Sequence, residues 1–242
     1  MKKYTLLYLC TALALGGCKH TAGNGTADNA NADQQEQSAK KENAAKIVRR
    51  TIPLGADFNN IMSLSGADIV FSQGDYSMEV EGDSVLMDYI ATEVESHMLT
   101  VSFASERNKS LSVYDSKLNM TVYVSAPELQ CVSICGKGNF TTKGLWIGDK
   151  IDMGMIGEGE FHCDSIECNN LQYQATGKGD AYFAHIKAGQ VHFANMSGSN
   201  VKADVDTESL LCDNVGHSTF SITGKAKSKE VNKGKGGKVL IE

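Results

Sequence analysis

The sequence predicts an all-β solenoid, a parallel β-helix with about 20 residues per coil. A short motif recurs as GKGNF at 136–140, GEGEF at 157–161 and GKGDA at 177–181, and more loosely as SGSNV at 197–201 and GHSTF at 216–220. The first residues of successive motifs are 21, 20, 20 and 19 positions apart. A repeat of this length is typical of solenoid proteins, in which each repeat forms one coil of a stack.

Two columns of apolar residues run through these repeats. Four positions before the first residue of each motif stand Val132, Met153, Tyr173, Phe193 and Cys212. Four positions after it stand Phe140, Phe161, Ala181, Val201 and Phe220. Even offsets place side chains on the same face of an extended strand, so both columns are expected to face the core.

The recurring glycines are predicted to be corners of the coils and not parts of a nucleotide site. Coils of a β-helix stack about 4.8 Å apart, so a side chain at a tight corner would collide with the neighbouring coil. A phosphate-binding loop needs GxxxxGK[ST], and a dinucleotide site needs GxGxxG between a strand and a helix. Neither pattern occurs in the chain.

Upstream of the repeats, three segments alternate apolar and polar residues and are expected to contain strands: 61–83, 99–106 and 122–134. The segment 83–95 is compatible with a short helix or with an irregular strand. Because the open end of a solenoid must be covered, this segment is expected to cap the stack.

The N-terminus has the features of a secretion signal. Residues 1–17 contain two lysines, then an apolar run over 6–15, then two glycines. The run is shorter than the ~20 residues that a membrane-spanning helix needs. The sequence LGGC at 15–18 resembles a bacterial lipobox, so Cys18 is expected to carry lipid and to anchor the mature chain to the outer membrane. An ordinary signal peptide followed by a chance cysteine is the alternative.

Residues 18–47 are expected to hold the lipidated cysteine and a flexible polar tether, and the β-helix domain is expected to span 48–242. Between residues 19 and 46 the chain has no Val, Ile, Leu, Met, Phe, Trp or Tyr, so it cannot bury enough apolar surface to offset its ordering entropy. The formal charge is −6, and it becomes −8 without the two lysines of residues 1–17. An acidic body argues against nucleic acid as a partner.

Five cysteines remain beyond the signal and the lipid site: Cys131, Cys135, Cys163, Cys168 and Cys212. In an extended strand Cys131 and Cys135 would lie about 13 Å apart, which is too far for a disulfide. The CxxxC and CxxxxC spacings are not those of common zinc modules. The thiols are therefore expected to be mostly reduced packing groups, and a disulfide between Cys163 and Cys168 across a turn is the alternative.

Several segments resemble a known family. FNNI at 58–61, GDYSMEVEGD at 74–83, VYVSAPEL at 122–129 and the repeated GxG followed by Asn, Asp or Glu are similar to the putative auto-transporter adhesin, head GIN domain family of bacterial lipoproteins and secreted proteins. The resemblance covers roughly residues 50–242. It implies a single-stranded, right-handed β-helix and an adhesin role, with no catalytic residues to transfer.

The chain departs from the usual Gly-Ser-Gly of this family. Lys137, Glu158 and Lys178 occupy the middle position, and the glycine pair is lost at 197 and 216. The three charges would form a ladder of ion pairs between coils, and such solvent-exposed pairs add little stability. A site for an anionic ligand is the alternative.

Glu160 and Asp180 share a column with Asn139, Asn200 and Thr219, three positions after the first residue of the motif. In neighbouring coils the two carboxylates would lie near 5 Å apart, a separation that also suits a glycosidase or a calcium site. The column belongs to the corner, however, where Asn and Asp commonly bind turn amides. We therefore expect a structural role for both carboxylates.

A platform that binds sugar rings could be formed by the aromatic residues Trp146 and Tyr182. His162 stands beside Tyr182 in the same column. An isolated tryptophan that packs on its own loop is the alternative. His162, His185, His192 and His217 share no column, so no zinc or catalytic cluster is expected. No GxSxG, HExxH or Cys/His pairing is present.

These observations predict a cell-envelope lipoprotein without catalytic activity or cofactor, in which a β-helix presents a binding or adhesion surface. Trp146, Glu160, His162, Asp180 and Tyr182 are the candidate surface, and a glycan or another component of an envelope or host surface is the candidate partner. A polysaccharide-acting enzyme and a purely structural envelope protein are the alternatives. Lys19 and His20 provide no acidic export patch, which favours the periplasmic side of the outer membrane over the cell surface.

The lipobox leads to a first testable prediction. Cys18→Ser should leave the chain without lipid and move it out of the detergent phase, because the modification requires the thiol of this residue. Mass spectrometry of the mature N-terminus checks the result. An unmodified residue other than Cys18 at that end would contradict the anchor.

Overall fold

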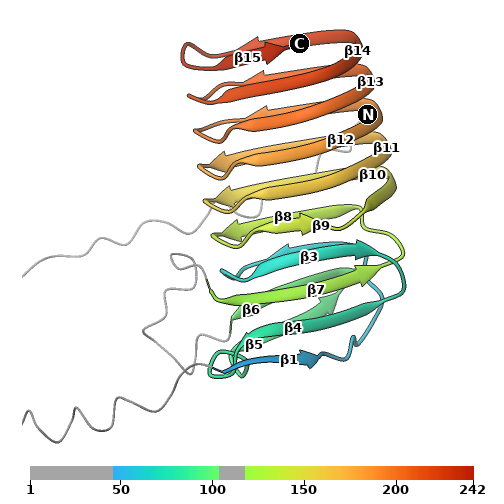
Figure 1. Cartoon of the computed structure of the whole chain (residues 1–242), viewed down its shortest axis with the longest axis vertical. Coiled ribbons are helices and arrows are strands. Elements are labelled where there is room, and N and C mark those ends of the chain that lie inside the picture. Colours follow the sequence, from blue (N-terminus) through green and yellow to red (C-terminus); the bar gives the residue numbers. More distant parts are fainter. Residues whose placement is uncertain (1–45, 104–117) are drawn as a thin grey trace, which may run out of the picture. The chain divides into compact units, whose positions relative to one another are not determined.

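The computed structural model describes residues 46–103 and 118–242. They form a β-solenoid of about six turns with about 20 residues per turn, in which no described residue is helical (Figure 1). The all-β solenoid predicted from the repeats is thereby confirmed. The predicted signal peptide, the predicted lipid site and most of the predicted tether lie outside the described residues. Ile47, expected at the end of the tether, is instead the first residue of a strand.

The C-terminal half is a regular stack of coils. Its strands are β10 (Leu145–Gly157), β11 (Phe161–Gly177), β12 (Ala181–Asn195), β13 (Val201–Asn214), β14 (Thr219–Lys233) and β15 (Lys238–Ile241). Each pairs in parallel with the next. The register aligns Met153 with Tyr173, Tyr173 with Phe193 and Phe193 with Cys212, as the apolar columns predict.

Coils in the N-terminal half do not follow the order of the sequence. One coil consists of β2 (Asn60–Ser63) and β3 (Asp68–Gln73), and another of β8 (Cys131–Gly136) and β9 (Phe140–Thr142). A third contains β6 (Met98–Phe103) and β7 (Met120–Ala126). Strand β2 pairs in parallel with β6 and β8, and β3 pairs in parallel with β7 and β9. The first coil in the sequence is therefore the middle one of the three in space. The expected strand at 99–106 is described only to residue 103.

Antiparallel strands close this end of the stack. They are β1 (Ile47–Thr51), β4 (Ser77–Asp83) and β5 (Ile90–Glu95), and Figure 1 places them at the opposite end from β15. The helix considered for 83–95 is wrong, since turns over 84–89 lead into β5. Ser96 and His97 have φ of 50° and 61°, which suits a two-residue hairpin between β5 and β6.

A continuous run of aromatic rings fills the core. Successive ring centroids lie 5.3 to 6.4 Å apart along Phe71, Phe140, Phe161, Tyr173, Phe183, Phe193 and Phe220. Because these rings come from several coils of the stack, their contacts join one coil to the next as well as strands within a coil. Aromatic burial of this kind is a large part of the energy that stabilises a fold.

The buried cysteines belong to the same core. Cys163 and Cys168 are buried free thiols, so the disulfide considered between them does not form. Burial raises the pKa of the Cys168 thiol to about 12, and it raises the pKa of the Cys163 thiol as well. Both groups therefore act as small apolar packing residues.

Several corner glycines leave no space for a side chain. Gly177 has a φ of 151°, and a Cβ atom on Gly179 would lie 1.7 Å from the carbonyl oxygen of Gly159 in the preceding coil. Where the glycine pair is lost, Ser197 and Ser199 donate hydrogen bonds from their hydroxyls to the carbonyl oxygen of Gly177. Serine thus replaces glycine by bonding to the backbone oxygen of the neighbouring coil.

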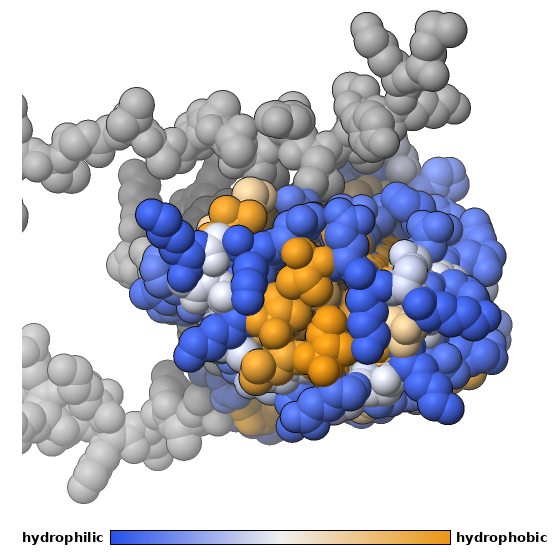
Figure 2. Space-filling model, turned by 90° about the horizontal axis from the view of Figure 1, so that it is seen from above, coloured by the Kyte–Doolittle hydropathy of each residue, from blue (hydrophilic) through white to orange (hydrophobic). Residues whose placement is uncertain are grey.

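The last coil carries charges that oppose further stacking. Lys229 occupies the inward column of Leu210, and Lys233 occupies that of Asn214. Figure 2, which views this end of the stack, shows an apolar centre surrounded by hydrophilic side chains. Ala226, Val239 and Ile241 are partly buried against the core here. Inward-column lysines on an edge coil are a common defence against pairing with another chain.

The core columns generate a prediction about stability. Phe161→Asp should unfold much of the domain, because an unpaired buried charge costs several kcal/mol against a total stability of about 5 to 15 kcal/mol. Phe161 is fully buried, whereas Lys178 is exposed, and Lys178→Ala should cost under about 1 kcal/mol. Thermal unfolding of the two variants compares them. Equal shifts in Tm would show that the inward and outward assignments are wrong.

Candidate functional site

A groove lies on the outer face of strands β11 to β14. Its volume is about 370 Å³, and one wall is the aligned set His162, Tyr182, Lys202 and Ser221. The other wall is formed two positions further along each strand by Asp164, Ala184, Asp204 and Thr223. The residues between the walls, such as Phe183, point into the core and form the floor. The small side chain of Ala184 leaves a gap in its wall and so deepens the groove.

The predicted neighbours His162 and Tyr182 form the aromatic part of this groove. Their rings stack with centroids 4.9 Å apart and an interplanar angle of 16°. His162 Nε2 lies 2.8 Å from Glu160 Oε2, and Tyr182 Oη donates to Asp180 Oδ2 at 3.4 Å. Four of the five candidate surface residues thus form one connected, solvent-accessible cluster. The structure places them together, although their role in binding is a prediction.

Trp146 is not part of this surface. Its side chain is 1% exposed, and its indole N–H donates to the carbonyl oxygen of Leu129 at 3.0 Å. Its ring packs 5.6 Å from Phe71 and 5.9 Å from Phe140. The expectation that Trp146 contributes to an exposed platform is therefore wrong, because the ring fills the core between two coils.

The corner column forms a ladder of hydrogen bonds to backbone amides. Asn139 N–H donates to Asp68 Oδ1 at 2.8 Å, and Glu160 N–H donates to Asn139 Oδ1 at 3.0 Å. Higher in the stack, Asn200 N–H donates to Asp180 Oδ1 at 2.8 Å, and Thr219 N–H donates to Asn200 Oδ1 at 2.9 Å. The predicted binding of turn amides by this column is confirmed for Asn139, Asp180 and Asn200.

Glu160 interrupts the ladder, since its carboxylate turns to His162 instead of bonding to the next coil's amide. The predicted charge ladder is also partial: Lys137 Nζ lies 3.2 Å from Glu158 Oε2, but among the described residues Lys178 has no ion pair. Both departures occur on the side of the corner that faces solvent. The coils stay in register through them.

Two other histidines also pair with carboxylates, and each does so separately. His185 Nδ1 lies 2.8 Å from Asp204 Oδ2, and His192 Nε2 lies 2.8 Å from Asp213 Oδ2. The hydrogen bond from His185 lowers the pKa of the Asp204 carboxyl below its usual value. In the described parts of the chain, no three His, Cys, Asp or Glu side chains converge as a metal site would require.

The groove contains polar residues that the sequence reasoning did not select: Asp164, Lys202, Asp204, Ser221 and Thr223. The sequence did contain a signal for them, because these residues stand five or seven places after the first residue of a motif, at positions that face outward. An aromatic face beside carboxylates, an ammonium group and hydroxyls is suited to a hydroxyl-rich ligand.

A β-solenoid with such a groove has the architecture of a repeat protein that exposes an extended surface for binding. The family model described as "Putative auto-transporter adhesin, head GIN domain" matches residues 57–199, and the chain belongs to this family. No curated protein sequence matches the chain. The family indicates a protein of the cell envelope or cell surface. Across the described residues, no helix has the length and apolar character to span a bilayer.

Solved structures share the fold at low sequence identity. A putative adhesin from Bacteroides fragilis NCTC 9343 is 20% identical with a TM-score of 0.63, over 81% of this chain and 97% of that one. A putative adhesin from Parabacteroides distasonis ATCC 8503 is 16% identical with a TM-score of 0.55, over 82% and 98%. A third putative adhesin, from Parabacteroides merdae ATCC 43184, is 16% identical with a TM-score of 0.51, and the match covers 81% of this chain and 96% of that one.

The amide ladder predicts different outcomes for two changes at one residue. Asp180→Ala should lower the free energy of unfolding by about 1 kcal/mol, because Asn200 N–H loses its acceptor. Asp180→Asn keeps an oxygen at this position and should have a smaller effect. Urea denaturation measures both variants. If the alanine variant were as stable as the wild type, the side-chain oxygen of Asp180 would have no role in holding the corner.

Proposed function

We propose that the chain is a non-catalytic binding module of the cell envelope, an adhesin-type lipoprotein held by lipid on Cys18. The observation that carries the proposal is the exposed stack of His162 and Tyr182 beside a groove of about 370 Å³. The family and the solved putative adhesins support the adhesin role. The proposed ligand is a glycan of an envelope or host surface, and the proposed location is the outer membrane, with the periplasmic side favoured.

The carboxylates near the groove favour binding over catalysis. A glycosidase needs an acid and a base, or a nucleophile, that are placed on either side of a scissile bond. Here Asp180 is bonded to the amide of Asn200, Glu160 is paired with His162, and Asp204 is paired with His185. These interactions hold corners and outward side chains in place, so they account for the carboxylates without a reaction.

The test uses the chain from residue 18 onward with Cys18→Ser, so that it is soluble and otherwise complete. Panels of bacterial, host and plant polysaccharides are screened for binding and for new reducing ends or unsaturated products. We expect binding without turnover, and loss of that binding when His162 and Tyr182 are both replaced by Ala. His192→Ala, which lies outside the groove, is the matched control and should bind as the wild type does.

Three results would contradict the proposal or the site assigned to it. Turnover that disappears in Glu160→Asn/Asp180→Asn, with the fold intact by circular dichroism, would make the protein a polysaccharide-acting enzyme. Absence of binding to every polysaccharide and envelope component would favour a structural envelope protein. Binding that survives in the His162/Tyr182 double variant would move the ligand site to another face.

A further inference from the structure

A second hollow lies nearer the N-terminal end of the stack. Its volume is about 210 Å³, and its lining includes Ser72, Ser77, Ser125, Tyr123 and Lys143. Ser77 and Ser125 share a hydrogen bond of 2.7 Å between their hydroxyls.

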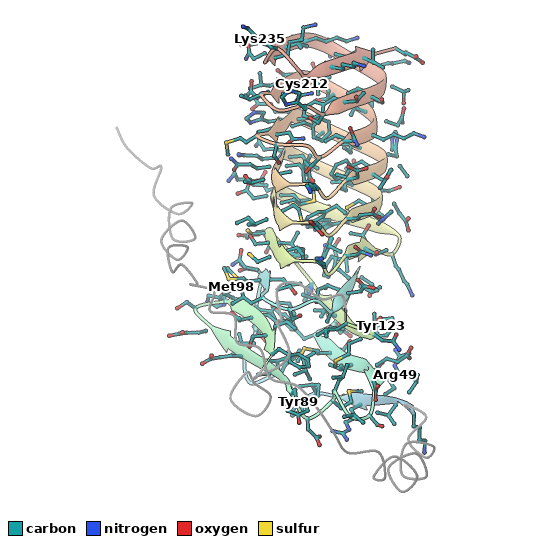
Figure 3. The ribbon with its side chains drawn as sticks, turned by 90° about the vertical axis from the view of Figure 1, so that its left-hand side faces the viewer. Arg49, Tyr89, Met98, Tyr123, Cys212 and Lys235 are labelled. Atoms are coloured by element: carbon teal, nitrogen blue, oxygen red, sulfur yellow. The ribbon has the colours of Figure 1, made fainter. Side chains whose placement is uncertain are left out.

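Two cations contact the ring of Tyr123 in this hollow. The guanidinium carbon of Arg49 lies 4.4 Å from the ring centroid, and Lys143 Nζ lies 5.5 Å from it. Arg49 Nε also donates to Glu79 Oε2 at 2.9 Å. Figure 3 shows Arg49 and Tyr123 on the same side of the body. The polar groups of this hollow are thus held in place by one another.

The two hollows lie between the same two columns of outward residues. Column A consists, strand by strand, of Glu79, Tyr123, Val70, Thr141, His162, Tyr182, Lys202 and Ser221. Column B stands two residues away from each of these and consists of Ser77, Ser125, Ser72, Lys143, Asp164, Ala184, Asp204 and Thr223. Lys143 directly follows β9, and the register of β12 with β13 shifts beside Ala184. Residues far apart in the sequence are therefore aligned along the solenoid axis.

The second hollow and the β11–β14 groove are also adjacent. Lys143 lines the former and Asp164 lines the latter, and the two residues are neighbours in column B. Asp164 Oδ2 accepts a hydrogen bond from Gly144 N–H at 3.1 Å, which joins their coils. The columns cross eight strands from β4 to β14, and with strands about 4.8 Å apart they run for about 34 Å. This length is far greater than one small ligand requires.

Charge along the two hollows is balanced. Arg49, Lys143 and Lys202 supply three positive charges, and Glu79, Asp164 and Asp204 supply three negative charges. A polyanion such as nucleic acid or a polyuronate would require an excess of cations. The balance, the hydroxyl groups and the Tyr182 ring instead suit an uncharged chain of sugar rings.

Resting on the proposed glycan-binding function, we infer that columns A and B form one axial track for an uncharged linear polysaccharide that crosses the coils. One part of the ligand lies against the exposed edge of the Tyr182 ring, where Asp164 and Asp204 accept hydrogen bonds from its hydroxyls. A second part lies over Ser72 and Ser125, where Lys143 donates. Affinity then depends on chain length, because a short oligosaccharide occupies only one of the two hollows.

The experiment measures Kd against oligomer length for neutral gluco-, manno- and N-acetylglucosamine oligosaccharides of two to eight units, with polygalacturonate oligomers as the charged comparison. The protein is the Cys18→Ser chain from residue 18 onward. We expect affinity for one neutral series to increase with length and then level off, and polygalacturonate oligomers to bind more weakly. Equal affinity for short and long oligomers, or tighter binding of the charged series, would overturn the inference.

Two blocking variants locate the ligand on the track. Ala184→Arg should weaken the binding of both short and long oligomers about tenfold, which is the effect expected of one anchor residue in an interface. Ser72→Arg should weaken the binding of long oligomers by a similar factor but leave the binding of short oligomers unchanged. Gln190→Arg, on the exposed face of β12 outside both columns, is the control.

The outcomes separate this inference from the function on which it rests. If Ala184→Arg reduces binding and Ser72→Arg has no effect at any length, the protein binds glycan at a single site and the track is wrong. If no oligosaccharide binds the wild-type chain, the glycan function itself fails, and the track fails with it.

Discussion

Close backbone contact at the corners is the constraint on which the rest of this structure depends. A Cβ atom on Gly138, Gly159 or Gly179 would lie 2.1, 2.0 or 1.7 Å from a backbone oxygen of the adjoining coil. These glycines therefore fix where each coil turns, and the strands that follow start in register. Because the register is shared, each outward residue is aligned with its equivalents, and the aligned residues make grooves along the axis. A surface that spans many coils is thus a consequence of small residues at the corners.

The corner column shows how a structural position becomes available for another role. Asn139, Asp180 and Asn200 use their side-chain oxygens to bind the amide of the next coil. Glu160 stands in the same column, but its longer side chain reaches His162, whose ring stacks on Tyr182. The glutamate side chain is one methylene longer than aspartate, so Glu160 binds the exposed His162–Tyr182 pair and not a backbone amide of the next coil. The groove begins at this point of the stack.

The sequence was sufficient to predict the regular part of the fold, because there each contact joins residues about 20 positions apart and the period is visible. It was insufficient for the position of β2 and β3, whose partners in β8 and β9 lie 71 residues away, as Asp68 and Asn139 do. The SGADI of residues 65–69 resembles SGSNV at 197–201 and was the available signal. The hairpin at Ser96 and His97 lacks the usual Asn-Gly. Trp146 was misplaced because burial of an isolated ring depends on contacts between coils.

The displaced order of the N-terminal coils has a consequence for how the chain reaches its native state. Strands β2 and β3 leave the ribosome before β6 to β9, yet they can complete their hydrogen bonds only after both flanking coils have been synthesised. Closing such long loops slows folding, whereas coils β10 to β15 need only the preceding neighbour as a template. Folding would thus begin with a slow nucleus and continue by rapid addition toward the C-terminus. For the proposed lipoprotein, which would cross a membrane unfolded, this arrangement gives time for export.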